Sequence, residues 1–383
     1  MECILYQTTE YIMTWADRQK NMLHYFKELL CTLSLLILIP ALSFADNTNQ
    51  KPPVSEIIME KHPATVPLSF VTIRNKTGSN IPADFFGGSR GKLLGGVATV
   101  TFSPIWGLEE IAQSAPFYIP DEKIELTSIN ETPLSDIYQQ IENFSDQDYG
   151  NTVVYTHGYN IDFEKGCRRA AIFQKALGLH DRLLYFSWPA DGNMLKYTWD
   201  EADLSWSVPH MTQFFEGLID HTGAGKVDIV AHSLGARGAV QALVRMAYRK
   251  DVEPIINELV LIAPDIDTDT FTLELPLLRT VVKRITVYVS ENDKALKLSH
   301  EVHGYPRLGE GGKYLTVVNE IETIDISNIS NRRLSGHLYH LFDPEVINDL
   351  TDLLHSGKKA AERKNLKKVQ SDNGVYYTLI SAL

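Results

Sequence analysis

The sequence predicts an α/β fold in which a mostly parallel sheet is covered by helices on both faces. From about residue 151 onward, short apolar runs of strand length alternate with segments of helical spacing. This alternation is typical of βαβ crossovers. At Val227–Arg237, an apolar and β-branched run passes directly into a helical pattern that begins at Leu234. The 44% hydrophobic and 22% charged residues are ordinary for a soluble globular protein.

Length, charge and cysteine content limit the number of domains, the kinds of partner and the disulfides that we expect. A chain of 383 residues can hold one large α/β domain or two smaller ones. Its net charge of −12 argues against a general nucleic-acid binder, so we expect no nucleic-acid partner. The cysteines are Cys3, Cys31 and Cys167. Because the first two lie in the N-terminal segment, a mature chain would keep only Cys167 and could form no internal disulfide.

The N-terminal segment, residues 1–45, has the pattern of a secretory signal peptide. Leu29–Leu42 is uncharged and strongly apolar, and small residues stand after it at Ser43 and Ala45. We predict cleavage after Ala45 and export to the periplasm or beyond. An uncleaved anchor is the alternative, but the apolar run is short for a membrane span of roughly 20 residues. Whether translation starts at Met1 or Met22 stays open.

Two segments precede the main domain. Residues 46–67 are polar and contain prolines, which is typical of a linker. Residues 68–120 form a predicted N-terminal β extension with strands at 69–74 and 95–102. The glycine-rich stretch 85–92 between these strands lacks the spacing of a phosphate-binding loop, so we interpret it as a hairpin connection.

Residues 121–356 are predicted to form the main domain, and residues 357–383 a basic tail. In the tail, the lysine-rich part at 358–368 is expected to be a solvated surface helix. The strands expected in the main domain are 152–156, 182–186, 227–230, 259–263, 285–289 and one within 314–326. The helices expected there are 135–144, 163–177, one around 214–219, one from 234, 271–279 and 344–354.

Ser233 lies where a strand becomes a helix, between Ala231 and Gly235. The pattern small-x-Ser-x-Gly in this context is a nucleophile elbow, whose tight turn excludes large side chains at both flanks. It directs the hydroxyl out of the sheet and places it at the positive end of the following helix. The pentapeptide alone fits an ordinary helix N-cap equally well. The choice between the two therefore depends on partner residues elsewhere in the chain.

A nucleophilic serine needs a general base and a carboxylate that orients the base. In the α/β-hydrolase arrangement the chain order is serine, acid, histidine. His337 lies in a polar loop between the last predicted strand and the closing helix, where the base is expected, and His340 is the alternative. Asp293 directly follows a predicted strand and is the preferred acid. Asp265 follows the preceding strand and is the alternative acid, or else a structural or pocket residue.

The tetrahedral intermediate of acyl transfer needs two backbone N–H donors for its oxyanion. One donor is expected at Leu234, directly after the serine. The other is expected in the loop His157-Gly-Tyr-Asn160, which follows the first core strand. Gly158 allows that backbone to turn close to the site, so we expect Tyr159 to supply the second donor.

Taken together, these segments resemble a bacterial α/β-hydrolase family catalogued as a domain of unknown function. The motifs that carry the resemblance are His157-Gly-Tyr-Asn160, Ser187-Trp-Pro-Ala190, Ala231-His-Ser-Leu-Gly-Ala-Arg237, Ala263-Pro-Asp-Ile-Asp267, Ser290-Glu-Asn-Asp293 and Gly336-His337. The resemblance covers most of the chain after the linker. It implies the α/β-hydrolase fold and a serine-hydrolase role for Ser233, Asp293 and His337. It implies no particular substrate.

The expected function is a secreted serine hydrolase that cleaves a small-molecule or lipid-like carboxylic ester through an acyl-enzyme. We expect no cofactor, no metal and no stable membrane span after signal cleavage. A thioesterase or acyltransferase would use the same groups, and a non-catalytic binding protein on this scaffold is a further alternative. A metal-dependent hydrolase built on His337/His340 or His300/His303 lacks a recognisable third ligand.

Other residues near the predicted strand ends are candidates for contact with substrate. Trp188, His232 and Asp265 are the candidate substrate-binding residues. Tyr197 and Trp199 could also line an acyl pocket, although aromatic residues after strands are more often packing residues. The segment 191–208 is the candidate for a mobile cap.

Overall fold

The computed structural model describes residues 63–105, 122–145, 150–248, 254–329 and 336–380. They lie within one compact unit, Glu60–Leu383. The predicted signal peptide and most of the predicted linker lie outside the described residues. Within the described residues, no helix combines the length and apolar character needed to cross a bilayer.

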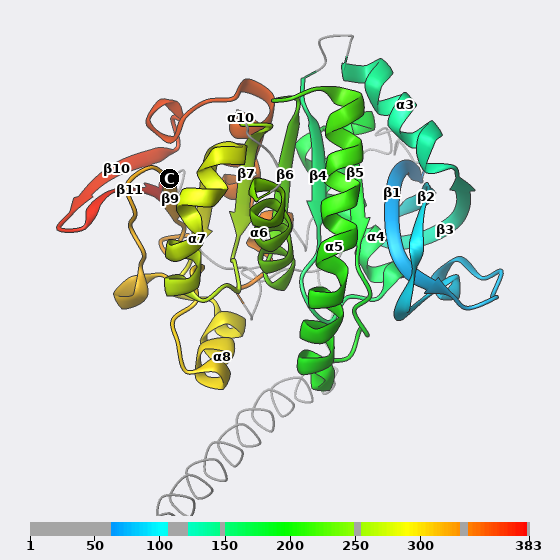
Figure 1. Cartoon of the computed structure of the whole chain (residues 1–383), viewed down its shortest axis with the longest axis horizontal. Helices are drawn as coiled ribbons and strands as arrows, with labels where there is room; N and C mark the ends of the chain where they lie inside the picture. The colour runs from blue at the N-terminus through cyan, green and yellow to red at the C-terminus, as the bar shows by residue number, and fades with distance from the viewer. Residues whose placement is uncertain (1–62, 106–121, 146–149, 249–253, 330–335, 381–383) are drawn as a thin grey trace, which may run out of the picture. The chain divides into compact units, whose positions relative to one another are not determined.

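An 11-stranded sheet runs through the described part of the chain, in the order β10-β11-β9-β8-β7-β6-β4-β5-β1-β2-β3 (Figure 1). The neighbouring pairs from β1 and β5 across to β9 and β11 are all parallel. The pairs β1–β2, β2–β3 and β10–β11 are antiparallel. The strands are β1 Ala64–Lys76, β2 Phe86–Pro104, β3 Glu122–Thr132, β4 Thr152–Thr156, β5 Leu183–Ser187, β6 Val227–His232, β7 Ile256–Ile262, β8 Val282–Val289, β9 Glu322–Asp325, β10 Leu366–Ser371 and β11 Gly374–Leu379.

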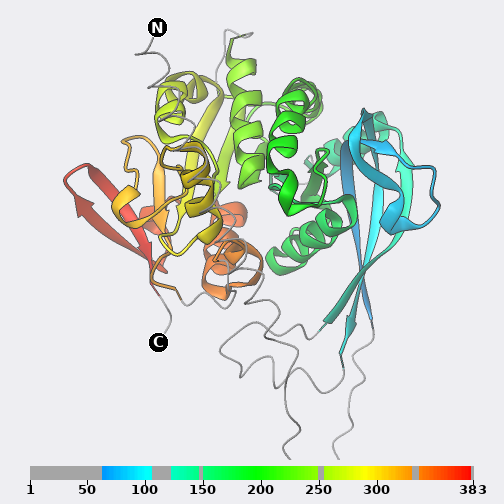
Figure 2. The same cartoon turned by 90° about the horizontal axis from the view of Figure 1, so that it is seen from below.

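Helices cover both faces of this sheet, as Figure 2 shows. One face carries α3, α5, α6 and α7, and the other carries α4, α9 and α10. The helices are α3 Leu134–Ser145, α4 Phe163–Leu177, α5 Tyr197–Thr222, α6 Leu234–Ala247, α7 Thr268–Val281, α8 Lys294–His303, α9 Tyr339–Phe342 and α10 Pro344–Ser356. The expected α/β-hydrolase fold, with a mostly parallel sheet between helical layers, is therefore confirmed.

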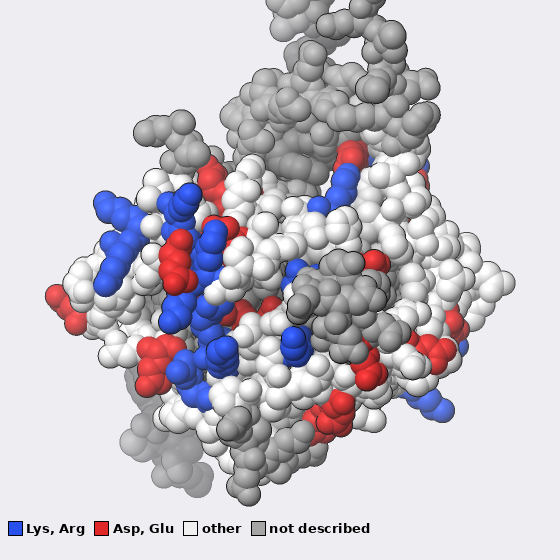
Figure 3. Space-filling model, turned by 90° about the horizontal axis from the view of Figure 1, so that it is seen from above, with Lys and Arg blue, Asp and Glu red and all other residues white. Residues whose placement is uncertain are grey.

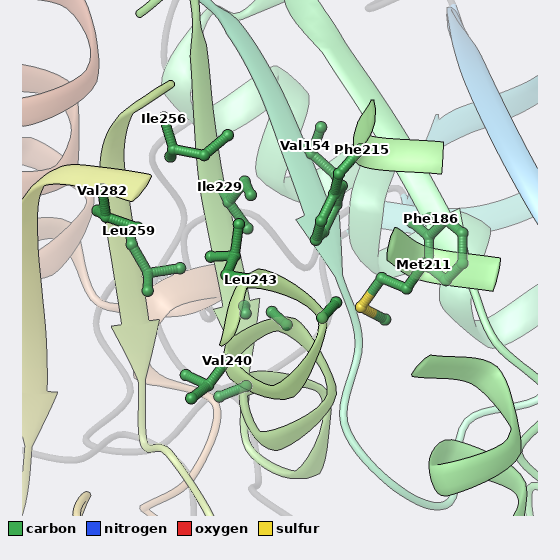
Figure 4. Packing of buried hydrophobic residues seen from close by; sticks show 14 of the residues in the cluster. Val154, Phe186, Met211, Phe215, Ile229, Val240, Leu243, Ile256, Leu259 and Val282 are labelled. Carbon is green, nitrogen blue, oxygen red and sulfur yellow. The ribbon is translucent and has the colours of Figure 1, made fainter. Parts of the chain in front are cut away.

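The central strands form because they are apolar on both sides. Along β4, Val154 packs into one hydrophobic cluster, while its neighbours Val153 and Tyr155 pack into the other. Successive strand side chains point to opposite faces, so such a strand is stable only between two helical layers. In the first layer, Val240 and Leu243 of α6 lie against the strand side chains (Figure 4).

The N-terminal strands are continuous with the central sheet. β1 and β2 contain the two strands predicted at 69–74 and 95–102, and β1 pairs in parallel with β5 through Ser69 and Leu184. β3 was not predicted, because its side chains are mostly polar and do not show the apolar alternation of a strand. The boundary drawn from the sequence at 120/121 falls between β2 and β3, which pair along Gly95–Pro104.

The structure of the C-terminal tail differs from the predicted one. The surface helix expected at 358–368 is wrong, because the chain forms a short 3-10 turn at Ala360–Glu362 and then the hairpin β10–β11. β-branched and aromatic residues in β11 favour a strand, and Gly374 takes a φ of 133° after the turn. β9 is consequently not the last strand, since β11 pairs with it in parallel.

Basic side chains gather on the side of the molecule where β10 and β11 lie (Figure 3). Lys364, Lys367 and Lys368, on or next to β10, are exposed. β10 ends the sheet, and lysines on an edge strand oppose pairing with a second chain.

Parallel pairing brings the carboxyl ends of β4, β5, β6, β7 and β8 to one edge of the sheet. The loops that follow these strands therefore converge there, as in other open α/β sheets, where ligands bind at this edge.

Candidate active site

Ser233 occupies a strained turn between β6 and α6. Its φ of 55° and ψ of −123° are rare for a residue with a Cβ atom. Two backbone hydrogen bonds hold the turn: Ser233 N–H donates to the Ile262 carbonyl at 2.9 Å, and Asp265 N–H donates to the Ser233 carbonyl at 3.2 Å. The Ser233 hydroxyl makes no capping bond to α6, so the residue is not an ordinary N-cap.

Glycines allow two other segments to approach this turn. A Cβ on Gly158 would lie 2.8 Å from the Cβ of Ser233, closer than real Cβ atoms approach other atoms. A Cβ on Gly235 would collide with the carbonyl oxygen of His157. The loop after β4 is therefore packed directly against the serine, and glycine is required at both positions.

His337 and Asp293 are joined although 44 positions separate them along the chain. His337 Nδ1 lies 2.6 Å from Asp293 Oδ2. The Asp293 side chain, at the start of α8 in the loop after β8, is fully buried, and the imidazole is 12% exposed. Because Nδ1 carries the proton donated to the carboxylate, Nε2 of the neutral ring is the acceptor nitrogen. The other Asp293 oxygen caps α8 through the N–H groups of Ala295 and Leu296.

His232 connects this pair to the serine. It directly precedes Ser233, its ring centroid lies 4.6 Å from that of His337, and its Nε2 lies 3.0 Å from the His337 carbonyl oxygen. The elbow and the His337–Asp293 pair therefore occupy the same corner of the sheet edge. His232 itself is buried, and burial lowers its pKa well below the ordinary value of 6.5.

The alternative base, His340, has a different environment. Its ring is fully buried behind His232, at a centroid distance of 4.5 Å, and its Nε2 lies 3.1 Å from the Tyr155 hydroxyl. Burial lowers the pKa of His340 well below its ordinary value, which keeps the ring neutral. The geometry favours His337 over His340 as the base.

The alternative acid, Asp265, belongs to a separate polar cluster. Its carboxylate accepts hydrogen bonds from the Tyr197 hydroxyl and the Ser299 hydroxyl, both at 2.6 Å. Arg237 and Arg307 lie 3.6 and 3.7 Å from the same group. Asp265 is buried, and its oxygens are engaged within the protein, which fits the structural reading of this residue better than direct contact with substrate.

The expected oxyanion donors lie on either side of Ser233. Leu234 is the first residue of α6, and the N–H groups of a first helical turn have no carbonyl partner within the helix. Tyr159 follows Gly158 in the loop after β4. The Gly158 carbonyl accepts a 2.7 Å hydrogen bond from His157 Nδ1. In a trans peptide the N–H points opposite to the carbonyl, so the Tyr159 N–H is directed away from the His157 ring.

Trp188 lies beneath this loop and not on an exposed pocket wall. It is fully buried, its Nε1–H donates to the His157 carbonyl at 2.9 Å, and its ring stacks on His157 at 4.9 Å. The structure therefore does not give Trp188 the expected place at the substrate surface. Tyr197 packs edge-on against Tyr159 at 5.1 Å, while Trp199 is 61% exposed.

The proposed cap segment 191–208 is largely the first half of α5. Leu204 and Val208 are buried in the core against α6, so this part of the segment is a packed helix. Sequence periodicity missed this start of the helix, which contains Pro209 in its interior. Asp200, in its first turn, accepts hydrogen bonds from the N–H groups of Asn160 and Asp191 and so ties two loops together.

The histidine pairs considered for a metal have carboxylate or hydroxyl partners. His300 Nδ1 lies 2.9 Å from Glu310, and His303 Nε2 lies 2.9 Å from Glu201. Among the described residues, no group of three or more His, Cys, Asp or Glu side chains is arranged to hold a metal ion.

Comparison with solved structures gave several hydrolases. The chain is similar to a predicted CIB-like hydrolase from Thermoplasma acidophilum, with 14% identity, a TM-score of 0.34 and coverage of 55% of this chain and 88% of that one. It is similar to an esterase from Pyrobaculum calidifontis, with 13% identity, a TM-score of 0.32 and coverage of 61% and 95%. It is also similar to carboxylesterase CesB (YbfK) from Bacillus subtilis, with 12% identity, a TM-score of 0.33 and coverage of 69% and 89%. No curated protein matches the sequence.

The decisive comparison is with protein families. Residues 136–355, more than half of the chain, match the profile of a single family. These residues run from the beginning of α3 to the end of α10 and include the elbow, Asp293 and His337. The chain therefore belongs to the family described as alpha/beta hydrolases of unknown function (DUF900).

Proposed function

We propose that this protein is a serine hydrolase that cleaves carboxylic esters through an acyl-enzyme on Ser233. The observation that carries the proposal is the 2.6 Å hydrogen bond between His337 Nδ1 and buried Asp293, in the same corner as a serine at a φ of 55°. A base whose tautomer is fixed by a carboxylate, beside a strained elbow serine, is the arrangement that acyl transfer requires.

In the first half of the reaction, the Ser233 hydroxyl oxygen attacks the ester carbonyl while His337 Nε2 takes its proton. The tetrahedral oxyanion accepts hydrogen bonds from the N–H groups of Tyr159 and Leu234. When the intermediate collapses, the bond to the alcohol oxygen breaks and the protonated His337 gives its proton to the departing alcohol. In the second half, water attacks the acyl-enzyme by the same route and releases the acid and free Ser233.

Asp293 contributes by orientation and charge. Its carboxylate holds His337 in the Nδ1–H tautomer and stabilises the imidazolium that forms during each proton transfer. Full burial keeps this carboxylate away from water, so the charge–charge attraction is screened less than it would be at the surface.

The substrate class we propose is a small-molecule or lipid-like ester. Export is part of the proposal and is supported by the apolar run and small residues of segment 1–45. Mass spectrometry of the protein recovered from an exporting bacterial host should show Asp46 as the first residue. An intact N-terminus on membrane-bound protein would contradict cleavage.

A fluorophosphonate probe tests the nucleophile directly. The wild-type protein should become covalently labelled and should hydrolyse p-nitrophenyl esters, and Ser233→Ala should do neither. Ser205→Ala is the matched control, because Ser205 is an exposed serine on α5 that bonds only to a helix carbonyl. Equal labelling of wild type and Ser233→Ala, or labelling of neither, would exclude Ser233 as nucleophile. Esters of graded acyl length would then define the preferred substrate.

A further inference from the structure

Arg74 is a fully buried guanidinium that belongs to β1, outside the segment matched by the family profile. It contacts the loops that follow β4 and β5. Its Nε donates to the Ser187 hydroxyl at 2.9 Å, its Nη1 donates to the Ala190 carbonyl at 2.8 Å, and its Nη2 donates to the Ile161 carbonyl at 2.6 Å. A longer bond of 3.2 Å joins Nη1 to the Gly87 carbonyl.

All these acceptors are neutral. Among the residues that the structure describes, no carboxylate forms an ion pair with Arg74, and Asp162 and Asp200 act on it only over longer distances. Burial lowers the pKa of Arg74 from 12.5, but an arginine side chain stays protonated in proteins. A buried cation without an ion-pair partner is costly, and hydrogen bonds to neutral acceptors offset only part of that cost.

A chain of polar contacts leads from Arg74 to the oxyanion loop. Arg74 Nη2 lies 3.5 Å from His157 Nε2, and His157 Nδ1 lies 2.7 Å from the Gly158 carbonyl oxygen. Only one tautomer satisfies both contacts: Nδ1–H donates to the carbonyl and Nε2 accepts from the guanidinium. Burial and the nearby Arg74 charge lower the pKa of His157 well below its usual value, which keeps the ring in this neutral form.

This chain acts on one peptide group, the bond between Gly158 and Tyr159. Its carbonyl is held by His157, so its N–H points the other way, and Gly158 lies against the Ser233 Cβ. A positive charge behind the carbonyl polarises the peptide and strengthens its N–H as a donor. Trp188 fixes His157 from the other side by stacking on its ring and donating to its carbonyl.

We propose that Arg74 is a positioning residue for ester cleavage, which acts through His157 to orient and polarise the Tyr159 N–H toward the oxyanion. This inference rests on the proposed function. It assigns the N-terminal strands a part in the chemistry, because β1 supplies Arg74, the charged member of the chain of contacts from Arg74 through His157 to the Gly158–Tyr159 peptide. The competing account is that Arg74 only fastens β1 and β2 to the neighbouring loops.

Arg74→Met tests the inference, because methionine fills similar space without charge or donors. We expect kcat to fall about 10- to 100-fold, less than the about 100- to 1,000-fold typical for loss of an oxyanion donor itself, with little change in KM. Arg74→Lys retains the charge but not the planar fork, and its kcat should lie between those of Arg74→Met and wild type.

Arg182→Met is the matched control. Arg182 also donates to two backbone carbonyls, those of Asn151 and Leu354, but it lies before β5, at the opposite edge of the sheet. We expect this variant to lose stability without losing kcat. An equal fall in kcat in Arg182→Met and Arg74→Met would assign the effect to general stability and overturn the inference.

Two inhibitors separate an effect on the oxyanion from an effect on substrate binding. A trifluoromethyl ketone adds to the serine and forms an oxyanion, whereas the methyl ketone of the same chain length binds without addition. In Arg74→Met, affinity for the trifluoromethyl ketone should fall by the same factor as kcat/KM, and affinity for the methyl ketone should stay within about threefold of wild type. Parallel changes in both affinities, or a folded Arg74→Met with kcat within about threefold of wild type, would overturn the inference.

A pair of His157 variants decides the question if Arg74→Met does not fold. His157→Asn keeps an amide donor near the position of Nδ1, whereas His157→Phe keeps the stacking on Trp188 but cannot donate to the Gly158 carbonyl. The Asn variant should retain a higher kcat than the Phe variant. Equal kcat in the two would overturn the inference that Arg74 acts through His157. A different result would contradict the proposed function itself: a wild-type protein that is not labelled by fluorophosphonate and does not hydrolyse esters. In that case the inference about Arg74 would fall with the proposed function.

Discussion

At the scale of single residues, Asp293 uses its two carboxylate oxygens for different partners. One oxygen accepts the His337 N–H, and the other caps α8. These two tasks can be separated by mutation, since asparagine caps a helix about as well as aspartate but cannot stabilise an imidazolium.

Asp293→Asn should therefore leave the fold intact and reduce kcat by about 10,000-fold, the size of loss expected when the base is held in the wrong tautomer. Circular dichroism and ester hydrolysis measure the two properties. Asp267→Asn is the control, because Asp267 caps α7 through Thr270 without a histidine partner. An Asp293→Asn enzyme with wild-type kcat would remove this carboxylate from the mechanism.

The burial of His340 leads to a prediction about how the free energy of unfolding depends on pH. Its pKa in the folded protein is well below 6.5, so the unfolded chain binds a proton that the folded chain excludes, and the free energy of unfolding falls as pH drops below 6.5. Replacing His340 by Phe removes this contribution. The stability of His340→Phe relative to wild type should thus improve by about 1.4 kcal/mol per pH unit below pH 6.5.

Urea unfolding between pH 7.5 and pH 5 measures the change. Tyr155→Phe is the control, because it removes the hydrogen bond to His340 without removing the imidazole, and its stability curve should run parallel to that of wild type. Parallel curves for His340→Phe and wild type would mean that His340 is protonated in the fold.

At the scale of elements, the C-terminal hairpin is fastened by a buried ion pair. Arg363 Nη1 lies 2.6 Å from Asp349 of α10 and 3.0 Å from the Tyr288 hydroxyl of β8, and both members of the ion pair are fully buried. Arg363 follows the 3-10 turn that leads into β10. The hairpin is thereby tied to the helix and the strand that it adjoins.

Arg363→Met should lower the free energy of unfolding by about 3–5 kcal/mol, because it leaves Asp349 buried without its partner. Activity per folded molecule should not change, since the cluster is not part of the site. Lys358→Met is the control: its pair with Asp352 is about one-third exposed on each side, and such pairs contribute about 1 kcal/mol or less. Similar losses in the two variants would show that the buried pair adds no special stability.

The sequence could predict those elements whose pattern is contained in neighbouring residues. The elbow is encoded in a few adjacent residues around Ser233, and Asp293 and His337 follow from chain order and strand ends. The hairpin was missed because the charge of Lys358, Lys367 and Lys368 masked a turn before Gly374. β3 was missed because polar residues dominate it and it pairs only with β2.

Arg74 could not have been found from the sequence. A buried arginine in an alternating strand resembles an exposed one, and most of its acceptors are backbone carbonyls, which have no sequence signature. Apart from Gly87, the partners of its guanidinium lie more than 80 positions away, so only the folded chain brings them together.

At the scale of the whole molecule, the N-terminal strands and the hydrolase core form one sheet. A chain that begins at residue 121, the boundary drawn from the sequence, would lack β1 and β2 and leave the apolar edge of β5 unpaired. We expect this fragment to aggregate, whereas a chain that begins at residue 60 should be folded and monodisperse. Size-exclusion chromatography of the two proteins measures this, and a soluble, folded 121–383 fragment would show that the core is independent.

The place of β1 in the sheet also has a consequence for biosynthesis. β1 meets β2 through a local hairpin, but its other neighbour, β5, is made later, and the bonded residues Thr72 and Ser187 are 115 positions apart. At roughly 5–20 residues per second, the ribosome needs about 6 to 23 seconds to supply that partner. During this interval the β1–β2 hairpin presents an unpaired apolar edge. We therefore expect chaperones that bind nascent chains to bind this edge.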